Sequence, residues 1–340
     1  MTNWDGNDML PAGDIVDQFA TGYLRTWVIR PDPDDNDQVR GYLWVRKPGA
    51  ERTKPQHAPL TAPCTIVNAL HTGGTRLVLP EPAAGGCRYR VDGTSTAARA
   101  ICEPDLPAHS RAIAATLREV GILVRGIEDV DTGELGNEHG PVLPPGAQRL
   151  LNWLPAGAGP RASAAAHAAL VTRLGKRRLG TSQEWCESLG RAGIHRDTGR
   201  LVLSHGAASL GSVILPDPAG QSCLLIGEDL MLGRRGVDIG FLLGELHELA
   251  VNADRYRGEQ PTRDVLRTAH QQLRAALLDG YGSVHDPGLV ARAGTVRILV
   301  HLHDFAAYVG WHPDLLRLAD LITELLDDGG RQLLPDAPER

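Results

Sequence analysis

Short runs of alternating apolar and polar residues, separated by turn signals, fill the first hundred positions of the chain. The clearest run is 41–47 (GYLWVRK), which is aromatic and β-branched and is followed by Pro-Gly. Strands are expected at 41–47, 64–70, 75–79, 87–91 and 97–102, with a polar, proline-bearing loop at 48–63. This part of the sequence therefore predicts a small strand-rich lobe that ends between Pro80 and Pro107.

Beyond Pro107 the apolar residues change from a strand period to a helical one. Ile113, Leu117, Val120 and Val124 share one helical face. On this basis helices are expected at 109–127, 162–174, 182–192, 237–251, 262–278, 289–309 and 313–327. Short strands at 201–203, 213–215 and 222–226 interrupt them, and a hairpin-like turn (PDPAG) joins the last two.

The two patterns together predict an α+β fold with two lobes. A small β-rich N-lobe is expected at residues 1–105, and a large, mainly helical C-lobe at residues 106–340. The length of 340 residues agrees with two lobes, because a single small core does not grow to this size. The strand–turn–strand unit inserted among the helices is the unusual feature.

Composition and charge exclude several classes of function. The formal net charge of −6 argues against general nucleic-acid binding. The five cysteines are scattered, with no CxxC pair, which argues against a disulfide framework and a zinc site. The apolar stretches are too short to span a bilayer, and the first residues lack the features of a secretory signal. We therefore expect a cytoplasmic protein with neither nucleic acid nor a membrane as partner.

Three segments in the second half carry the candidate chemistry. They read LVLSHGAASLGSVIL at 201–215, LLIGED at 224–229 and GRRGVDIGFLL at 233–243. In order, spacing and strand–helix setting they resemble the aminoglycoside-phosphotransferase-like kinase family. That family has a strand, then His-Gly-Asp with an Asn five residues after the Asp. A strand pair ending in Ile-Asp, a Gly-Asp-Pro turn and a helix-opening Asp follow. The resemblance implies a two-lobed, protein-kinase-like fold.

Carried over residue by residue, the resemblance implies that the scaffold of the site is kept. His205 and Gly206 match the His-Gly pair, and His205 is a catalytic candidate. Gly233 matches the glycine of the turn, and Asp238 matches the helix-opening Asp, whose role in the family is mainly structural. Ala207, however, stands where the family has its acceptor-orienting Asp. A methyl group can neither orient a hydroxyl nor take its proton, as phosphoryl transfer requires.

The remaining candidate positions are changed rather than lost. Ser212 stands where the magnesium-binding Asn is expected, and a hydroxyl can still ligate Mg²⁺, though less well. Glu228 and Asp229 lie beside the metal-binding position, so they are candidate metal ligands and catalytic residues; the alternative is a solvated strand end. Lys47, with its neighbour Arg46, is the candidate cation for the phosphates of ATP; the alternative is an exposed strand-end lysine. ATP and Mg²⁺ are the cofactors that the resemblance implies.

A second group of titratable residues, His301, His303 and Asp304, resembles a metal cluster in composition. Positions two apart on a helix do not share a face, so a polar helix edge is the favoured interpretation. Glu245 and Glu248 are likewise expected at a surface or an interface.

The pattern of losses further resembles the kinase-like proteins of ribosomally made peptide pathways in actinobacteria, including the class V lanthipeptide and thioamitide types. In these pathways such a protein cooperates with a separate lyase to phosphorylate and then dehydrate Ser or Thr of a precursor peptide. The resemblance therefore implies a degenerate kinase-like subunit whose partners are a lyase and a precursor peptide. Two alternatives stay open: a self-sufficient phosphotransferase for an antibiotic or a sugar, and a pseudokinase scaffold that binds no nucleotide.

Overall fold

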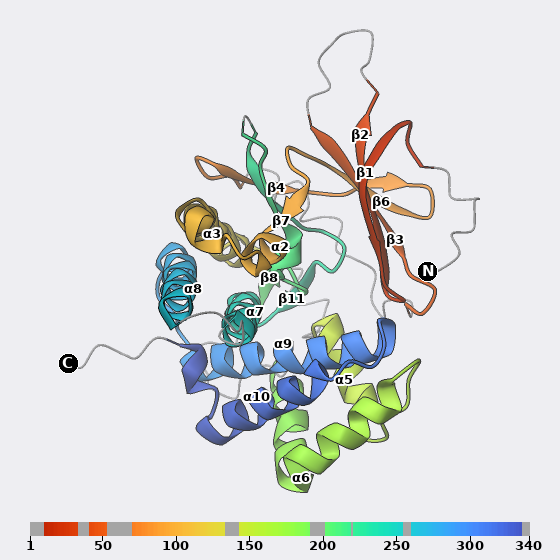
Figure 1. Ribbon diagram of the computed structural model, residues 1–340, viewed down its shortest axis with the longest axis vertical. Coiled ribbons are helices and arrows are strands. Elements are labelled where there is room, and N and C mark those ends of the chain that lie inside the picture. Colours follow the sequence, from red (N-terminus) through yellow and green to blue (C-terminus); the bar gives the residue numbers. More distant parts are fainter. Residues whose placement is uncertain are drawn as a thin grey trace, which may run out of the picture.

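The computed structural model describes residues 10–32, 41–52, 70–132, 143–190, 201–218, 220–253 and 260–334 of the chain. Figure 1 shows a small lobe built of strands and a larger lobe built of helices. The small lobe is an antiparallel sheet in the order β1-β2-β3-β6-β5. Its strands are β1 (Gly13–Ala20), β2 (Leu24–Pro31), β3 (Tyr42–Pro48), β5 (Glu81–Ala83) and β6 (Gly86–Val91).

A second sheet joins the two halves of the sequence. Its order is β4-β10-β9-β7, with β4 (Thr75–Val78), β7 (Ser95–Thr96), β9 (Val213–Leu215) and β10 (Ser222–Leu225). β10 runs antiparallel to β9, as the predicted hairpin requires, and parallel to β4 from the first hundred residues. Val28 and Trp44 of the small lobe share a buried cluster with Ile214 and Leu225 of the hairpin. The lobes are therefore joined by a continuous core on this side.

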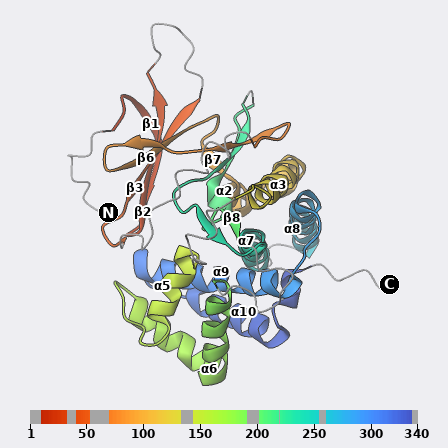
Figure 2. The ribbon, with the colours of Figure 1, turned by 180° about the vertical axis from the view of Figure 1, so that it is seen from behind.

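Helices form the larger lobe together with a short strand pair, β8 (Val202–Ser204) and β11 (Met231–Gly233). The helices are α2 (Ala97–Cys102), α3 (Leu106–Glu128), α5 (Pro145–Trp153), α6 (Ser163–Ser188), α7 (Val237–Ala253), α8 (Gln260–Tyr281), α9 (Pro287–Tyr308) and α10 (Asp314–Asp328). The 3₁₀ turns η1 (Leu210–Ser212) and η2 (Arg331–Leu333) complete the lobe. α3 and α8 lie side by side in both views (Figures 1 and 2), and α7 packs along α9. In the part of the chain that the structure describes, no helix is long and apolar enough to cross a membrane.

The predicted α+β fold, with a small β-rich lobe and a large helical lobe, is confirmed by this architecture. The strand predicted at 97–102 is wrong, because these residues form α2. Thr96 caps α2 by accepting a hydrogen bond from the Arg99 N–H at 3.1 Å, and the segment AARAIC is rich in helix-favouring alanine. The division of the chain at residue 105 remains a prediction. The strand expected at 64–70 lies outside the described residues except for residue 70.

Helix α6 consists of two helical parts that meet at Gly175, where the backbone φ is 68°. The predicted end of the first helix at 174 agrees with this break, whereas the second part begins directly after Gly175 rather than at 182. Only glycine adopts this left-handed conformation at little cost, so Gly175 permits the kink between the two helical parts. The end of the second predicted helix, residues 191 and 192, lies outside the described residues.

The core of the helical lobe depends on a close contact of α7 with α9. A Cβ atom on Gly244 of α7 would lie 2.2 Å from the carbonyl oxygen of Gly294 on α9. One turn earlier, a Cβ on Gly240 would lie 2.6 Å from the Val290 carbonyl oxygen. No side chain fits at either position unless one helix moves. These glycines therefore set the spacing of the two helices.

We expect Gly244→Ala to lower the free energy of unfolding by on the order of 1–3 kcal/mol, because the added methyl group must push α7 away from α9. Gly180 gives a matched control, since it is an exposed glycine of α6 with nothing within 4 Å of a Cβ. Gly180→Ala should leave stability unchanged or raise it by up to about 1 kcal/mol. Urea unfolding followed by circular dichroism measures both, and equal effects of the two changes would contradict the close-packing argument.

A buried carboxylate ties the start of α7 to the end of α3. Glu128 accepts hydrogen bonds from the Gly236 N–H at 2.8 Å and from the Tyr281 hydroxyl at 2.7 Å. The Arg235 guanidinium lies 3.6 Å from the same carboxylate. Burial outweighs these contacts and raises the pKa of Glu128 to about 7.

Protonation of Glu128 should therefore favour the folded state. The folded protein holds this proton to higher pH than the unfolded chain, in which the pKa of glutamate is near 4.5. The contribution to stability is fully present below pH 4.5 and is lost as the pH rises through about 7. Between about pH 5 and pH 8, wild type should lose unfolding free energy relative to Glu128→Gln, which cannot ionise. Parallel pH profiles of urea unfolding for the two proteins would contradict this assignment.

Candidate functional site

One carboxylate of helix α7 holds the turn that follows strand β8. Asp238, in the first turn of α7 and buried, accepts hydrogen bonds from the Ser204 hydroxyl at 2.7 Å and the His205 N–H at 2.6 Å. It also accepts one from the Gly206 N–H at 3.1 Å. Gly233, in β11, pairs with β8 and leads the chain back to α7. The resemblance requires His205 and Asp238 to lie together, and the structure places them in direct contact.

The imidazole of His205 is bonded at both nitrogens. Its Nε2 donates to the Leu225 carbonyl of β10 at 2.8 Å, because a carbonyl oxygen can only accept. Its Nδ1 accepts the Ala207 N–H at 3.4 Å. His205 therefore links the turn to the hairpin and, in this arrangement, orients the backbone around Ala207. Its predicted catalytic role stays a prediction.

Gly206 brings the turn against the chain at Asp229. Its φ is 81°, and a Cβ at this position would lie 2.1 Å from the Asp229 carbonyl oxygen. Any side chain would both strain the backbone and collide with this oxygen. The turn and the segment 228–229 are thus in contact, and Ala207 lies beside them on the wall of the same cleft.

Glu228 and Asp229 have different electrostatic surroundings. Arg46 lies 3.1 Å from Glu228, the Tyr89 hydroxyl donates to it at 2.9 Å, and Arg52 is 3.6 Å away. Burial raises the pKa of Glu228, but these partners together hold it below its ordinary value. Asp229 has a looser contact, 3.8 Å from Arg52, and burial raises its pKa. Glu228 is therefore a neutralised carboxylate, and Asp229 is the more basic of the two.

The side chains around the Glu228 carboxylate form an ion-pair network rather than a set of magnesium ligands. Mg²⁺ needs several oxygen ligands in near-octahedral geometry. Among the residues that the structure describes, no group of three or more His, Cys, Asp or Glu is placed to hold a metal ion. The oxygens of Glu228 already face Arg46, Arg52 and Tyr89. In this arrangement Glu228 is engaged by cations, and the magnesium-binding role of Glu228 and Asp229 stays a prediction.

Strand β3 sends Arg46 and Lys47 to opposite faces of the sheet. Arg46 points into the cleft, with its guanidinium 5.6 Å from the ring centroid of Tyr89. Lys47 is buried on the other face, with its ammonium 5.8 Å from the ring centroid of Trp27. Adjacent residues of a strand alternate in this way. Arg46 is therefore brought together with the other predicted site residues, whereas Lys47 is not.

Ser212 ends the η1 turn on the cleft wall. Its backbone N–H donates to the Ser209 carbonyl at 2.9 Å, and its side chain is largely buried. Two helices hold this loop: Glu245 of α7 accepts the Leu210 N–H at 3.0 Å, and Arg297 of α9 lies 3.3 Å from Glu245. The loop that carries Ser212 is thus fixed to the α7–α9 pair.

A second charged network, not anticipated from the sequence, lines the opposite wall of the cleft. Arg149 of α5 donates to Asp304 of α9 at 3.1 Å and to the Tyr23 hydroxyl at 3.0 Å. The Tyr23 ring has Arg149 at 4.4 Å and Arg52 at 4.7 Å from its centroid. Burial acts to raise the pKa of Asp304, but Arg149 lowers it to about 2. Asp304 therefore stays ionised and paired with Arg149. Through Tyr23, this network joins the small lobe to α5 and α9.

The turn between β1 and β2 also touches the helical lobe through its backbone. The Gly22 N–H of this turn donates to the Tyr308 carbonyl at 2.8 Å. Just after β3, Glu51 forms a further contact with the helical lobe by pairing with Arg161 at 3.0 Å. Between these contacts and the shared sheet lies a cleft of about 330 Å³ that Arg46, Glu228 and residues 205–209 help to line. The structure thus places the predicted segments 205–212 and 225–229 at the junction of the lobes.

No protein-family model matches the sequence, and no curated protein matches it. Among solved structures, the chain is similar to a choline kinase from Cryptosporidium parvum Iowa II, with 10% identity over 94% of this chain and 89% of that one, and a TM-score of 0.48. It is similar to a spectinomycin phosphotransferase in complex with ADP and spectinomycin, with 9% identity over 95% of each chain and a TM-score of 0.48. An ethanolamine kinase from Plasmodium vivax gives 10% identity over 94% and 83%, and a TM-score of 0.48. Because these TM-scores are below 0.5, the fold class rests on the architecture described above.

Replacing Asp238 by Asn should destabilise the protein by on the order of 2–4 kcal/mol, since both carboxylate oxygens accept hydrogen bonds and the amide must turn its NH₂ towards a buried donor. Asp264→Asn is the matched control, because Asp264 forms an exposed pair with Arg267 at 3.3 Å. Such a pair contributes about 1 kcal/mol or less. Thermal unfolding by calorimetry should separate the two variants clearly, and similar melting temperatures would show that Asp238 does not anchor the turn.

Proposed function

We propose that this protein is a degenerate kinase-like phosphotransferase subunit that transfers no phosphate on its own and acts within a complex. The observation that carries the proposal is the chemistry of the cleft. Ala207 supplies no base after the anchored turn at His205 and Gly206, and Glu228 is neutralised by Arg46 at 3.1 Å. Phosphoryl transfer needs a carboxylate at the acceptor hydroxyl and free positive charge for the phosphates, whereas here Arg46 is already paired with Glu228.

The same ion pairs oppose the binding of nucleotide. Arg46 and Arg149 face Glu228 and Asp304, each at 3.1 Å. ATP phosphates would have to replace these carboxylates, and Mg²⁺ would have to replace the arginines. Breaking a partly buried pair is costly because each charge is left without its partner. We therefore expect the isolated protein to bind ATP and Mg²⁺ weakly, and a partner that rearranges the cleft to strengthen binding.

For the partners, we infer a separate lyase and a ribosomally made precursor peptide, so that the complex phosphorylates and dehydrates Ser or Thr. The support is the pattern of losses in the kinase-like motif, with Ala207 and Ser212 in place of the expected Asp and Asn, which resembles the kinase-like proteins of such pathways. The retained scaffold is consistent with this role, because a fixed turn and hairpin can present a surface to another chain even without a catalytic base.

A self-sufficient small-molecule phosphotransferase is the second candidate function. The cleft of about 330 Å³ is within the usual range of small-molecule pockets. Asp229 lines this cleft and its pKa is raised by burial, so it is the group that could serve as the base. This function would need the Arg46–Glu228 pair to open for the nucleotide.

Adding the missing carboxylate tests the proposal directly. The isolated wild type should turn over MgATP slowly or not at all, because the loss of one acid–base group costs about a hundredfold to ten-thousandfold in rate. Ala207→Asp should raise phosphate release by roughly tenfold or more, whereas Ala207→Asn, of equal size but without a base, should not. Release of labelled phosphate measures this. Several turnovers per second by wild type alone, on a small hydroxyl substrate, would exclude the proposal.

Light scattering coupled to size exclusion tests the complex itself. The protein should co-elute with the lyase or the precursor peptide encoded by neighbouring genes at about 10 μM, a concentration that detects micromolar affinities. The Ala207→Asn variant should co-elute equally, since residue 207 is not expected to form the interface. A monomer that binds neither component would contradict the proposed complex and would favour the small-molecule phosphotransferase.

A further inference from the structure

The two lobes are joined differently on the two sides of the cleft. On one side they share the sheet β4-β10-β9-β7 and the buried cluster that contains Val28, Trp44, Ile214 and Leu225. On the other side, hydrogen bonds and an ion pair link the loops of the small sheet to α5, to the start of α6 and to the end of α9. Polar contacts can exchange with water while a buried core stays intact, so this second side is the one that can open.

Two loops of the small lobe form a single unit at this side. The Glu51 N–H donates to the Gly22 carbonyl at 2.9 Å, and the Gly49 N–H donates to the Tyr23 carbonyl at 2.8 Å. A Cβ on Gly49 would lie 2.2 Å from the Gly22 carbonyl oxygen, so no side chain fits between the loops. Residues 21–23 and 49–52 are therefore expected to move together.

The turn 21–23 is attached to two helices. The buried Gly22 N–H donates to the Tyr308 carbonyl at the end of α9 at 2.8 Å. The Tyr23 hydroxyl accepts a hydrogen bond from Arg149 of α5 at 3.0 Å, and its ring centroid lies 5.1 Å from that of Tyr308. Figures 1 and 2 both show this end of the small sheet beside the end of α9. The turn thus closes over the cleft that Tyr23 and Arg149 line.

A further attachment uses a residue with an unusual backbone. Arg161, just before α6, donates to both carboxylate oxygens of Glu51 at 3.0 and 3.1 Å and to the Val309 carbonyl at 3.0 Å. Its φ is 49°, and among the described residues it is the only non-glycine residue with a positive φ. Such a conformation costs energy, so it persists because these contacts hold it. The contacts of Gly22 with Tyr308, Tyr23 with Arg149 and Glu51 with Arg161 are together called the clasp.

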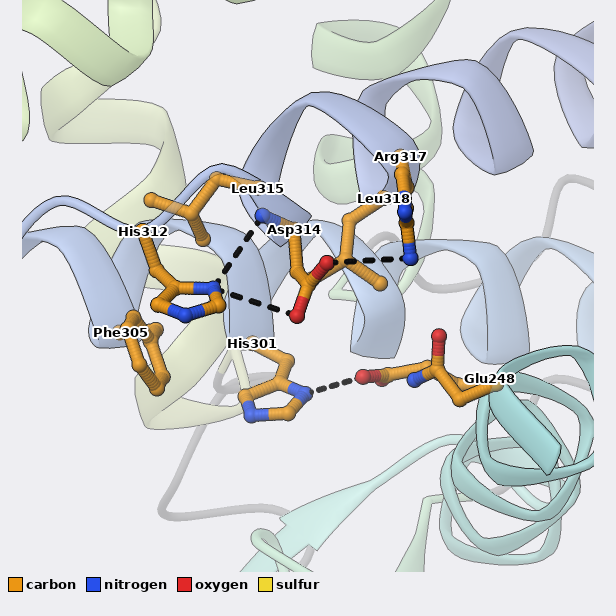
Figure 3. Close-up of a pocket in the computed structure, with 9 residues that line it drawn as sticks. Glu248, His301, Phe305, His312, Asp314, Leu315, Arg317 and Leu318 are labelled. Atoms are coloured by element: carbon orange, nitrogen blue, oxygen red, sulfur yellow. Dashed lines mark hydrogen bonds and ion pairs between the residues drawn. The ribbon is translucent and has the colours of Figure 1, made fainter. Parts of the chain in front are cut away.

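The helix that receives the clasp is fixed on its other side. Figure 3 shows Glu248 of α7 bonded to His301 of α9, at 2.6 Å. One turn earlier on α9, Arg297 lies 3.3 Å from Glu245 of α7. Because the glycine contacts described above also lock the spacing of α7 and α9, α9 cannot follow the small lobe. A separation of the lobes must therefore occur at the clasp.

Opening of the clasp would change the charges of the cleft. Arg52 directly follows Glu51 and lies 3.6 Å from Glu228 and 3.8 Å from Asp229. These two carboxylates follow β10 of the shared sheet, so they stay behind when the unit of 21–23 and 49–52 moves outward. A guanidinium freed from its carboxylates can bind the oxygens of a phosphate. In the closed state this cation is paired inside the protein.

We propose that the clasp is an autoinhibitory contact, which keeps the cleft closed to nucleotide until its release frees Arg52 for the phosphates. The inference rests on the proposed function in one respect, namely that the partner in the complex releases the clasp. The closed state itself belongs to this chain and can be tested without the partner. When the closed state predominates, the apparent affinity for nucleotide falls with the fraction of open molecules, so weakening the clasp must strengthen binding.

Hydrogen exchange of the Gly22 amide, measured by NMR on the full-length protein, reports opening of the clasp directly. Glu51→Ala should accelerate this exchange by about two- to fivefold, the effect of losing one partly exposed ion pair. The Ile226 N–H, which donates to the Val78 carbonyl at 3.0 Å on the joined side, should exchange at an unchanged rate. An unchanged rate for Gly22, or equal acceleration of the two amides as in a general loss of stability, would overturn the proposal.

Glu81→Ala is the matched control. It removes an exposed ion pair with Arg88, at 2.8 Å, that lies within the small sheet and does not join the lobes. Neither the Gly22 nor the Ile226 amide should exchange faster in this variant. Acceleration of Gly22 exchange by Glu81→Ala as large as that by Glu51→Ala would show that the effect does not come from the clasp.

Calorimetric titration with MgATP tests whether the clasp controls the cleft. Glu51→Ala should bind MgATP about two- to fivefold more tightly than wild type, and Glu81→Ala should bind it as wild type does. Neither Glu51 nor Glu81 is among the residues that line the cleft, so a gain in affinity would arise from opening. Equal or weaker binding by Glu51→Ala, or no binding by any of the three proteins, would overturn the autoinhibitory role. Either result leaves the co-elution experiment unaffected, so failure of this inference is distinguishable from failure of the proposed function.

Discussion

The buried carboxylate of Asp238 fixes the geometry on which the rest of the cleft depends. It belongs to α7 but accepts three hydrogen bonds from the turn after β8, so the strand and the helix cannot move independently. That turn in turn positions His205, whose ring reaches the Leu225 carbonyl of the hairpin. Gly206 then brings the turn against the Asp229 backbone. The positions of His205 and Gly206 in the cleft therefore depend on this one anchored turn.

The anchoring also explains how the fold accommodates Ala at position 207. The hydrogen bonds that hold the turn involve the backbone of residues 205 and 206 and the side chain of Asp238, while residue 207 contributes a backbone N–H to His205. An Ala side chain at 207 therefore removes no bond that the scaffold needs. In the cleft, Glu228 is stabilised by Arg46 and Tyr89 rather than by a metal ion. The hydrogen bonds that hold the turn therefore do not depend on the side chain at residue 207.

The sequence allowed most of the long helices, the hairpin and the anchored motif to be predicted, because each has a local pattern. It did not reveal β1, β2 or α5. It also missed α2, since six residues are too few to show a helical period against a strand one. It favoured Lys47 as the cation of the cleft, whereas Arg46 faces the cleft, because alternation along β3 fixes that the two oppose each other but not which one faces the cleft. The contacts of Arg149 with Tyr23 and Asp304 join positions 126 and 155 residues apart, and no local signal marks such pairs.

Helices α7 and α9 are linked by a ladder of ion pairs. Glu245 and Glu248 lie about one turn apart on α7, and Arg297 and His301 lie one turn apart on α9. The rung from Glu245 to Arg297, at 3.3 Å, holds the cleft loop through the Leu210 N–H. The rung from Glu248 to His301, at 2.6 Å, is the next one along the two helices. The glycine contacts at Gly240 and Gly244 leave α7 and α9 no room to approach further. The loop that carries Ser212 is therefore held by a helix pair whose spacing is fixed by close backbone contact, so a change that moves α7 relative to α9 also moves this wall of the cleft.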